Sequence, residues 1–147
     1  MATARRTRTI SAPIQQVWEL IADPDHMPRW WPGVVRMESV SSDRFTQVFQ
    51  TKRGRPVRMD FQVLVSEAPY HLAWSQEIPG TPFERVLGES VTEVVLKPES
   101  ESTEVTIAWR QRMRGYSRTG GLLLRRASGR KLAEALDSLE RALVDPR

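Results

Sequence analysis

Residues 10–33 read ISAPIQQVWELIADPDHMPRWWPG, and they predict two short helices that follow the end of a strand. The Ser-Ala-Pro run at 11–13 is typical of a helix start, because proline fits the first turn and presets φ. Four apolar residues then recur at the spacing of one helical face: Ile14, Val17, Trp18 and Ile21. Asp23 precedes a proline, which disfavours the α conformation and ends this helix. A second short helix is expected over 25–31, where a Pro-Gly pair stops it.

Outside this segment the pattern changes to that of strands separated by turn residues. One strand is expected before it, over 4–10. Six strands are predicted after it: 34–41, 44–51, 57–66, 70–77, 83–97 and 103–113. Residues 57–65 alternate apolar and polar side chains, which indicates an antiparallel strand with one buried face. The apolar phase breaks within 83–97, and a β-bulge there would restore it.

The C-terminal part of the chain returns to helical periodicity. Four leucines share one face of this predicted helix: Leu132, Leu136, Leu139 and Leu143. Leu122, Leu123 and Leu124 extend the apolar stripe upstream, so one helix of about 35 Å is expected over 121–143. Gly129 lies inside it, at a cost of about 1 kcal/mol relative to alanine.

The order of these elements predicts a cavity. A sheet of seven antiparallel strands twists and curls strongly, and its concave face must be covered. The C-terminal helix is the one predicted element long enough to cross that face, and the two short helices close one end of it. Because a single helix does not fill the hollow of a curled sheet, an apolar cavity is expected between them. Such cavities are the usual setting of a small-molecule site.

The opening segment also carries residue pairs that are typical of one superfamily: Ala12-Pro13, Val17-Trp18, Asp23-Pro24 and Trp31-Pro32. Residues 91–98 and 103–109 are similar to its paired late strands. Over nearly its whole length the chain resembles the START-like (SRPBCC) superfamily, of the polyketide cyclase/dehydrase type. The resemblance implies an α+β helix-grip fold. In that fold a curved seven-stranded antiparallel sheet is wrapped on a long C-terminal helix, with two short N-terminal helices, here as a single domain over 1–147. The superfamily includes lipid carriers, quinone-binding proteins, aromatase/cyclases, chaperone activators and allergens, so the fold alone supplies no activity.

Several kinds of chemistry are excluded or disfavoured by composition. The chain has no cysteine, which excludes disulfides and thiolate sites. Its two histidines, His26 and His71, are far apart in sequence, so no metal site is expected. No phosphate-binding glycine loop or dinucleotide fingerprint occurs, and no cofactor is expected. The sequence singles out no catalytic residue.

The formal net charge is +4, and the basic residues are mostly arginine. The arginines fall in short clusters spread along the chain, which predicts a solvated face and no nucleic-acid partner. The N-terminus lacks the apolar run of a secretory signal, and no stretch reaches the length of a transmembrane segment. A cytoplasmic location is expected, and the sequence favours no particular oligomeric state.

Ten residues are predicted to line the cavity and to bind its ligand. Tryptophan offers a large flat surface for stacking, and at most one of the adjacent pair Trp30 and Trp31 is expected to face inward. Polar side chains on otherwise apolar strand faces would orient the ligand, with Glu89 as a partner for Arg85. The predicted set is Trp30, Trp31, Gln47, Phe49, Met59, Phe61, Trp74, Arg85, Trp109 and Gln111.

Three functions agree with this sequence. The first is binding of a hydrophobic or aromatic small molecule, such as a lipid, a quinone or a polyketide-like compound, in the cavity. The second is a polyketide cyclase or dehydratase that acts on a poly-β-ketone without metal or nucleotide cofactor. An enzyme of that kind requires a buried polar cluster with a perturbed pKa. The third is a protein-interaction module, similar to ribosome-associated or chaperone-activating proteins, which requires an exposed apolar or single-sign patch.

Overall fold

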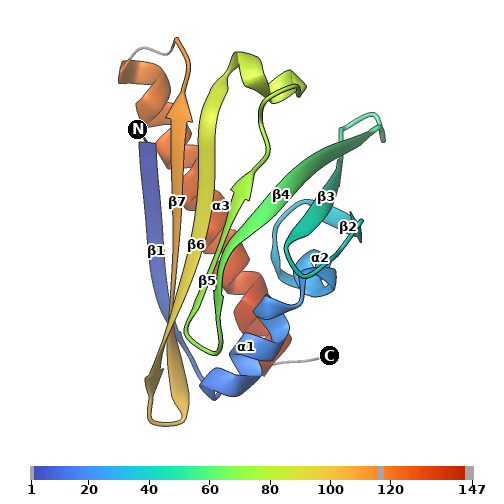
Figure 1. The fold of residues 1–147 in the computed structure, drawn as a ribbon. Helices are drawn as coiled ribbons and strands as arrows, with labels where there is room; N and C mark the ends of the chain where they lie inside the picture. Colours follow the sequence, from blue (N-terminus) through green and yellow to red (C-terminus); the bar gives the residue numbers. More distant parts are fainter. Residues whose placement is uncertain (1, 116–117, 145–147) are drawn as a thin grey trace.

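The computed structural model describes residues 2–115 and 118–144, and its elements follow the predicted order (Figure 1). The strands are β1 Ala2–Ile10, β2 Val34–Glu38, β3 Arg44–Gln50, β4 Pro56–Glu67, β5 His71–Gln76, β6 Leu87–Glu99 and β7 Ser102–Met113. The α-helices are α1 Ile14–Ala22, α2 Met27–Trp30 and α3 Arg118–Val144. Two 3-10 turns, η1 and η2, span Pro24–His26 and Pro82–Arg85.

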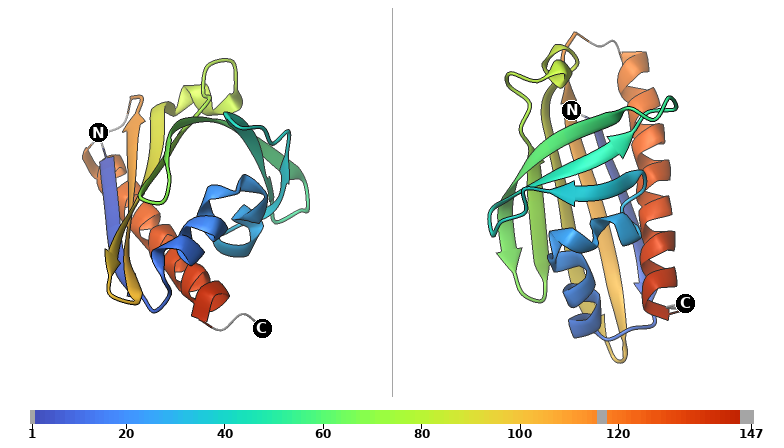
Figure 2. Two further views of the ribbon diagram at one scale, coloured as in Figure 1. Left: turned by 60° about the horizontal axis from the view of Figure 1, so that its bottom comes forward. Right: turned by 90° about the vertical axis from the view of Figure 1, so that its right-hand side faces the viewer.

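The strands form one antiparallel sheet in the order β1-β7-β6-β5-β4-β3-β2. Figure 2 shows the sheet curled around the side on which the three α-helices lie. The predicted helix-grip fold is therefore confirmed. The alternation predicted for residues 57–65 is also confirmed, since Phe61 is buried while its neighbours Asp60 and Gln62 are exposed.

Helix α3 covers the concave face along one end of the sheet. It contacts β1, β7 and α2, and Arg8 of β1 forms an ion pair with Asp137 of α3. The inward stripe of its C-terminal half is buried and belongs to the main core: Leu132, Ala135, Leu136, Leu139 and Leu143. The leucine spacing in the sequence thus identified the packing face of this half of the helix correctly.

The helix expected over 25–31 is divided into η1 and α2, and the strand expected over 34–41 ends at Glu38. Two larger differences from the sequence prediction affect the site. The strand expected from residue 83 begins only at Leu87, because Thr81 and a following proline start a 3-10 turn: the Thr81 hydroxyl accepts the Phe83 backbone N–H at 3.3 Å. The register with β7 shifts between Leu87 and Glu89, within the segment where a β-bulge was expected.

The upstream leucines of α3 are the second difference. Leu122 and Leu123 are 50% and 61% exposed and do not extend the buried stripe. The inward positions of this half are instead Ser128 and Lys131, which precede Leu132 and Ala135 at helical spacing. The face of α3 that covers the sheet is therefore polar in the N-terminal half of the helix and apolar in the C-terminal half.

A stability prediction arises at Gly129, which is buried in α3 against β1. An added methyl group would lie 2.4 Å from Nη2 of Arg6, the mobile end of an exposed side chain that can move aside. Because alanine favours a helix interior by about 1 kcal/mol over glycine, Gly129→Ala is expected to raise the free energy of unfolding by about 0.5–1 kcal/mol. Urea denaturation measures the change. A loss of stability would mean that the helix needs glycine for its approach to β1.

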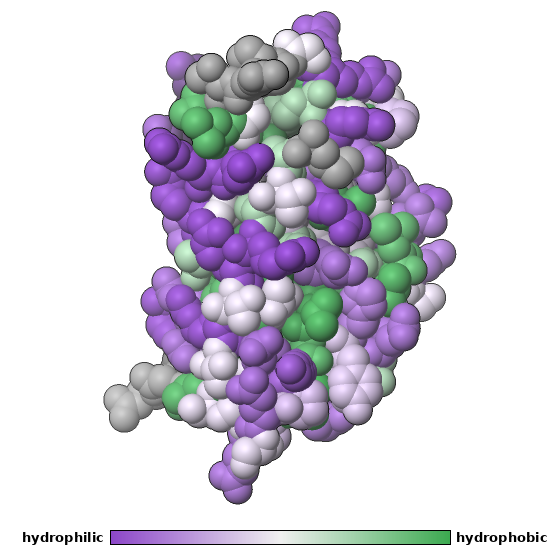
Figure 3. Space-filling view, turned by 90° about the vertical axis from the view of Figure 1, so that its left-hand side faces the viewer, coloured by the Kyte–Doolittle hydropathy of each residue, from purple (hydrophilic) through white to green (hydrophobic). Residues whose placement is uncertain are grey.

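The arginines whose side chains the structure describes lie at the surface, as predicted; Arg8 alone among them is half-buried. Figure 3 shows a largely hydrophilic face of the molecule on the side of β1. Nine arginines from three of the predicted clusters are exposed: Arg53, Arg55, Arg58, Arg110, Arg112, Arg114, Arg125, Arg126 and Arg130. Some of the surface arginines form ion pairs. Arg58 and Arg36 both donate hydrogen bonds to the Glu38 carboxylate, and these bonds lower the pKa of Glu38 to about 2.

Candidate ligand-binding site

A cavity of about 170 Å³ lies between α3 and the concave face of the sheet. Its apolar lining is mostly aromatic: Trp31, Phe49, Met59, Phe61, Trp74, Phe83, Leu87 and Trp109. Its polar lining comes from β3, β5, β6, β7 and α3: Gln47, Gln76, Ser90, Thr92, Gln111 and Lys131. An apolar enclosure with a few polar groups is the usual composition of a small-molecule site.

The hollow arises from a row of side chains across three strands. Thr92 of β6 pairs with Trp74 of β5 on one side and with Trp109 of β7 on the other. All three face the cavity. Because a small threonine stands between two indoles, the centre of the row is recessed, and the rings form the walls on either side.

Trp31 encloses the hollow from the side of α2. It is the C-cap of that helix, and its extended backbone is followed by Gly33 at φ +85°. A side chain at Gly33 would meet the Phe49 ring at 3.2 Å, so glycine allows this turn to lie close against β3. The Trp31 ring packs edge-on against Trp74 and Trp109, with centroids 5.8 Å apart in each pair.

The polar groups of the cavity are held by specific hydrogen bonds. The Trp109 Nε1–H donates to Ser90 Oγ at 2.9 Å, and the Ser128 hydroxyl donates to Gln111 Oε1 at 2.8 Å. Gln47 Nε2 donates to the sulfur of Met27 at 3.2 Å. The Gln76 side chain is buried, and its Nε2 has no hydrogen-bond partner in the described part of the chain. Three of the six polar lining side chains are thus held in position, while Gln76 keeps an unused donor.

Lys131 brings a positive charge to this lining. Its Nζ lies 4.9 Å from the centroid of the Phe49 ring and 5.8 Å from that of Trp109. Burial lowers the pKa of the ammonium from its ordinary value, and the charge of Glu134 on the same helix partly opposes this effect. The two rings supply a weak cation–π attraction that compensates part of the lost hydration.

Comparisons with known proteins place the chain in a family. A family model described as polyketide cyclase / dehydrase and lipid transport matches residues 1–144. The chain belongs to this family. No curated protein matches it in sequence.

Several solved structures have the same fold as this member of the polyketide cyclase / dehydrase and lipid transport family. A START superfamily protein from Mycobacterium smegmatis has a TM-score of 0.80 at 10% identity, with all of both chains covered. The di-domain ARO/CYC BexL from the BE-7585A biosynthetic pathway has a TM-score of 0.79 at 22% identity. That match covers 99% of this chain and 47% of BexL. The protein TTHA0849 from Thermus thermophilus has a TM-score of 0.74 at 20% identity, with 98% of each chain covered.

The structure brings eight of the ten predicted residues together around the cavity of this family member: Trp31, Gln47, Phe49, Met59, Phe61, Trp74, Trp109 and Gln111. Trp30 is buried behind Trp31 and does not line the cavity, so only one of the adjacent pair faces inward, as expected. The placement of Arg85 was wrong. It lies exposed in η2 rather than on a strand, and no ion pair joins it to Glu89 in the described residues.

Six lining residues were missing from the prediction: Gln76, Phe83, Leu87, Ser90, Thr92 and Lys131. Two signals could have found some of them. Ser90 and Thr92 are in phase with the apolar residues Val94 and Leu96, which places all four on one face of the strand. Lys131 lies four residues before Ala135 on the inward stripe of α3. The others depend on where β5 ends and η2 begins.

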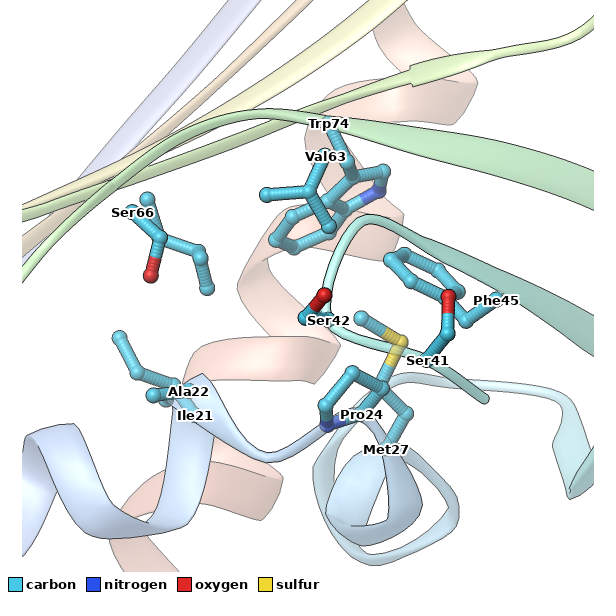
Figure 4. Close-up of a pocket in the computed structure, with 11 residues that line it drawn as sticks. Ile21, Ala22, Pro24, Met27, Ser41, Ser42, Phe45, Val63, Ser66 and Trp74 are labelled. Carbon is cyan, nitrogen blue, oxygen red and sulfur yellow. The ribbon is translucent and has the colours of Figure 1, made fainter. Parts of the chain in front are cut away.

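A second pocket of about 110 Å³ lies between the N-terminal helices and β3–β5 (Figure 4). Trp74 and Val63 form one wall, and Pro24 and Met27 lie opposite them. Trp74 also lines the central cavity, so its indole separates the two spaces.

Two kinds of feature are absent from the described residues: a candidate metal site and a helix that could span a membrane. In residues 2–115 and 118–144, no group of three or more His, Asp or Glu side chains could hold a metal ion. No helix in the same residues is long and apolar enough to cross a membrane.

Proposed function

We propose that the protein binds a hydrophobic or aromatic small molecule in the central cavity. The observation that carries this proposal is the aromatic enclosure between α3 and the sheet, in which Trp31, Trp74 and Trp109 surround a space of about 170 Å³. Membership of a family described by cyclase, dehydrase and lipid-transport activities supports it. A protein-interaction module would need an exposed patch instead of this cavity, so small-molecule binding is the better account.

The size of the cavity limits the ligand. An apolar cavity of about 150 Å³ accommodates benzene in another protein. A space of about 170 Å³ therefore fits one or two fused rings, or one end of a longer lipid or polyketide-like chain.

Binding is expected at one site per chain. A neutral bicyclic probe, 2-naphthalenemethanol, should bind with a Kd on the order of tens of micromolar, from about −0.5 kcal/mol per non-hydrogen atom. Isothermal titration calorimetry measures the affinity and stoichiometry. Native mass spectrometry of the purified protein, followed by organic extraction, would identify a ligand carried from the cell. Absence of binding at millimolar probe, together with no extracted ligand, would contradict the proposal.

A second candidate is a cyclase or dehydratase that acts on a poly-β-ketone in the same cavity. It requires a buried polar cluster. Gln111 lies in the lining with Lys131, whose pKa is lowered by burial, and the buried Ser128 donates a hydrogen bond to Gln111 from outside the lining. These groups could orient an enolate and move a proton. Conversion of a poly-β-ketone model compound into a cyclised product would favour this candidate, and unchanged recovery of the compound would favour binding alone.

A further inference from the structure

Lys131 differs from the other residues that line the central cavity in its charge. Among the described lining residues it is the one side chain that carries a charge at neutral pH. No carboxylate lies within 4.0 Å of its Nζ in the described part of the chain, because none of the ion pairs there includes it. Lys131 is half-buried, and a partly desolvated ammonium without a counterion is unfavourable, so the side chains around Lys131 compensate its charge only in part.

We propose that Lys131 binds the anionic group of the ligand, and that the ligand is a compact aromatic acid: one or two rings with a carboxylate, phenolate or enolate. This inference rests on the proposed function, since it assigns the ligand of the same cavity. The ring would lie among Trp31, Trp109 and Phe49, and the anionic group would lie at Nζ beside α3.

The position of Lys131 supports this assignment. Its Nζ lies over Phe49 and near Trp109, two rings of the cavity wall, so an anion at Nζ places an attached ring against the same walls. Ser128 precedes Lys131 by one helical turn and is hydrogen-bonded to Gln111, which makes this side of the cavity the polar one. A neutral apolar ligand would leave the ammonium without a partner.

A structural role explains the geometry less well. A lysine that only covers apolar surface usually extends its ammonium into water. Here the ammonium lies over two rings, and burial lowers its pKa. Methionine would cover the same rings without a partly desolvated charge, so packing alone does not account for a lysine at this half-buried position.

The test compares an anionic and a neutral probe of the same shape, 2-naphthoate and 2-naphthalenemethanol, by isothermal titration calorimetry at pH 7. The wild-type protein is expected to prefer 2-naphthoate by about 10-fold or more, as for a charge-assisted hydrogen bond. Lys131→Met should abolish this preference and leave the affinity for the alcohol within about threefold. Lys97→Met, the same change at an exposed site on β6, serves as the matched control and should change neither affinity.

Each other outcome overturns a stated part of the account. If the wild-type protein binds both probes equally, or if Lys131→Met keeps the preference, the assignment of Lys131 is wrong while the proposed binding function stands. If neither probe binds the wild-type protein, both proposals fail. Lys131→Gln provides a second variant where methionine disturbs folding. Equal loss of both probes in the two folded variants would show that Lys131 shapes the cavity instead of holding an anion.

The pH dependence adds an independent readout. The anion binds the protonated amine, so the affinity for 2-naphthoate should be full at pH values above the pKa of the probe's carboxyl group and below the pKa of Lys131. It should fall as pH rises through the pKa of Lys131. Because that pKa is lowered, the fall should begin at a lower pH than for an exposed lysine. Glu134 is the charged group that acts on Lys131 from its own helix, and the groups facing it from β3 and β7 are the uncharged rings of Phe49 and Trp109. The alcohol should show no such decline.

Discussion

Replacing Trp74 with alanine is expected to lower the free energy of unfolding by about 3–5 kcal/mol, the usual cost of removing a buried large aromatic side chain. Trp74 is 1% exposed, and its ring packs edge-on against Trp31, Trp30 and Phe45 at centroid distances of 5.8, 6.4 and 6.1 Å. These rings come from β3 and from the segment around α2, so the loss would loosen the contact between the sheet and the N-terminal helices.

Urea denaturation measures this effect, as a lower midpoint at an unchanged slope. Val95→Ala is the control, because Val95 is 40% exposed and its removal should cost well under 1 kcal/mol. A cost below about 1 kcal/mol for Trp74→Ala would contradict the central place of this indole in the core. Stability is the proper readout here. Removal of Trp74 would also join the central cavity to the second pocket, and the change in cavity volume would alter ligand binding independently of stability.

Filling the recess at Thr92 is expected to abolish binding while the fold persists. Thr92 lies between Trp74 and Trp109 in the sheet and faces the cavity. The central cavity of about 170 Å³ has room for two fused rings at most, so a phenyl ring introduced by Thr92→Phe would take the space that the bicyclic probe needs. The affinity for 2-naphthalenemethanol should fall about 100-fold or more, and the free energy of unfolding should change by no more than about 1–3 kcal/mol.

The matched control is Val95→Phe, the same added ring on the opposite face of β6. Val95 points away from the cavity and is largely exposed, so this variant should bind the probe as the wild-type protein does. Calorimetric titration of both variants gives the comparison. Unimpaired binding by a folded Thr92→Phe variant would place the site outside the central cavity.

The sequence was most informative where one periodicity controls an element. The leucines from 132 to 143 predicted the packing face of α3, and the alternation over 57–65 predicted which side of β4 faces the core. Both patterns arise because one face of a helix or strand is buried and the other is solvated. The fold class follows from the number and order of such elements.

The site was harder to predict because it depends on local events within strands. A 3-10 turn at Pro82–Arg85 displaced Arg85 to the surface, and alternation alone does not reveal such a turn. Lys131 was missed because a charged residue beside a leucine stripe normally belongs to the solvated face. Only the packing of α3 against Phe49 and Trp109 shows that its ammonium lies at the cavity.

The central claim is that α3 lies across the curved sheet and leaves room beneath it for a small molecule. Crystals of the protein grown with 2-bromonaphthalene, measured at the bromine absorption edge, test it directly. One anomalous peak is expected in the central cavity, among Trp31, Trp109 and Phe49. A cavity closed by side chains, with no bromine peak between α3 and the sheet at saturating probe, would contradict the account.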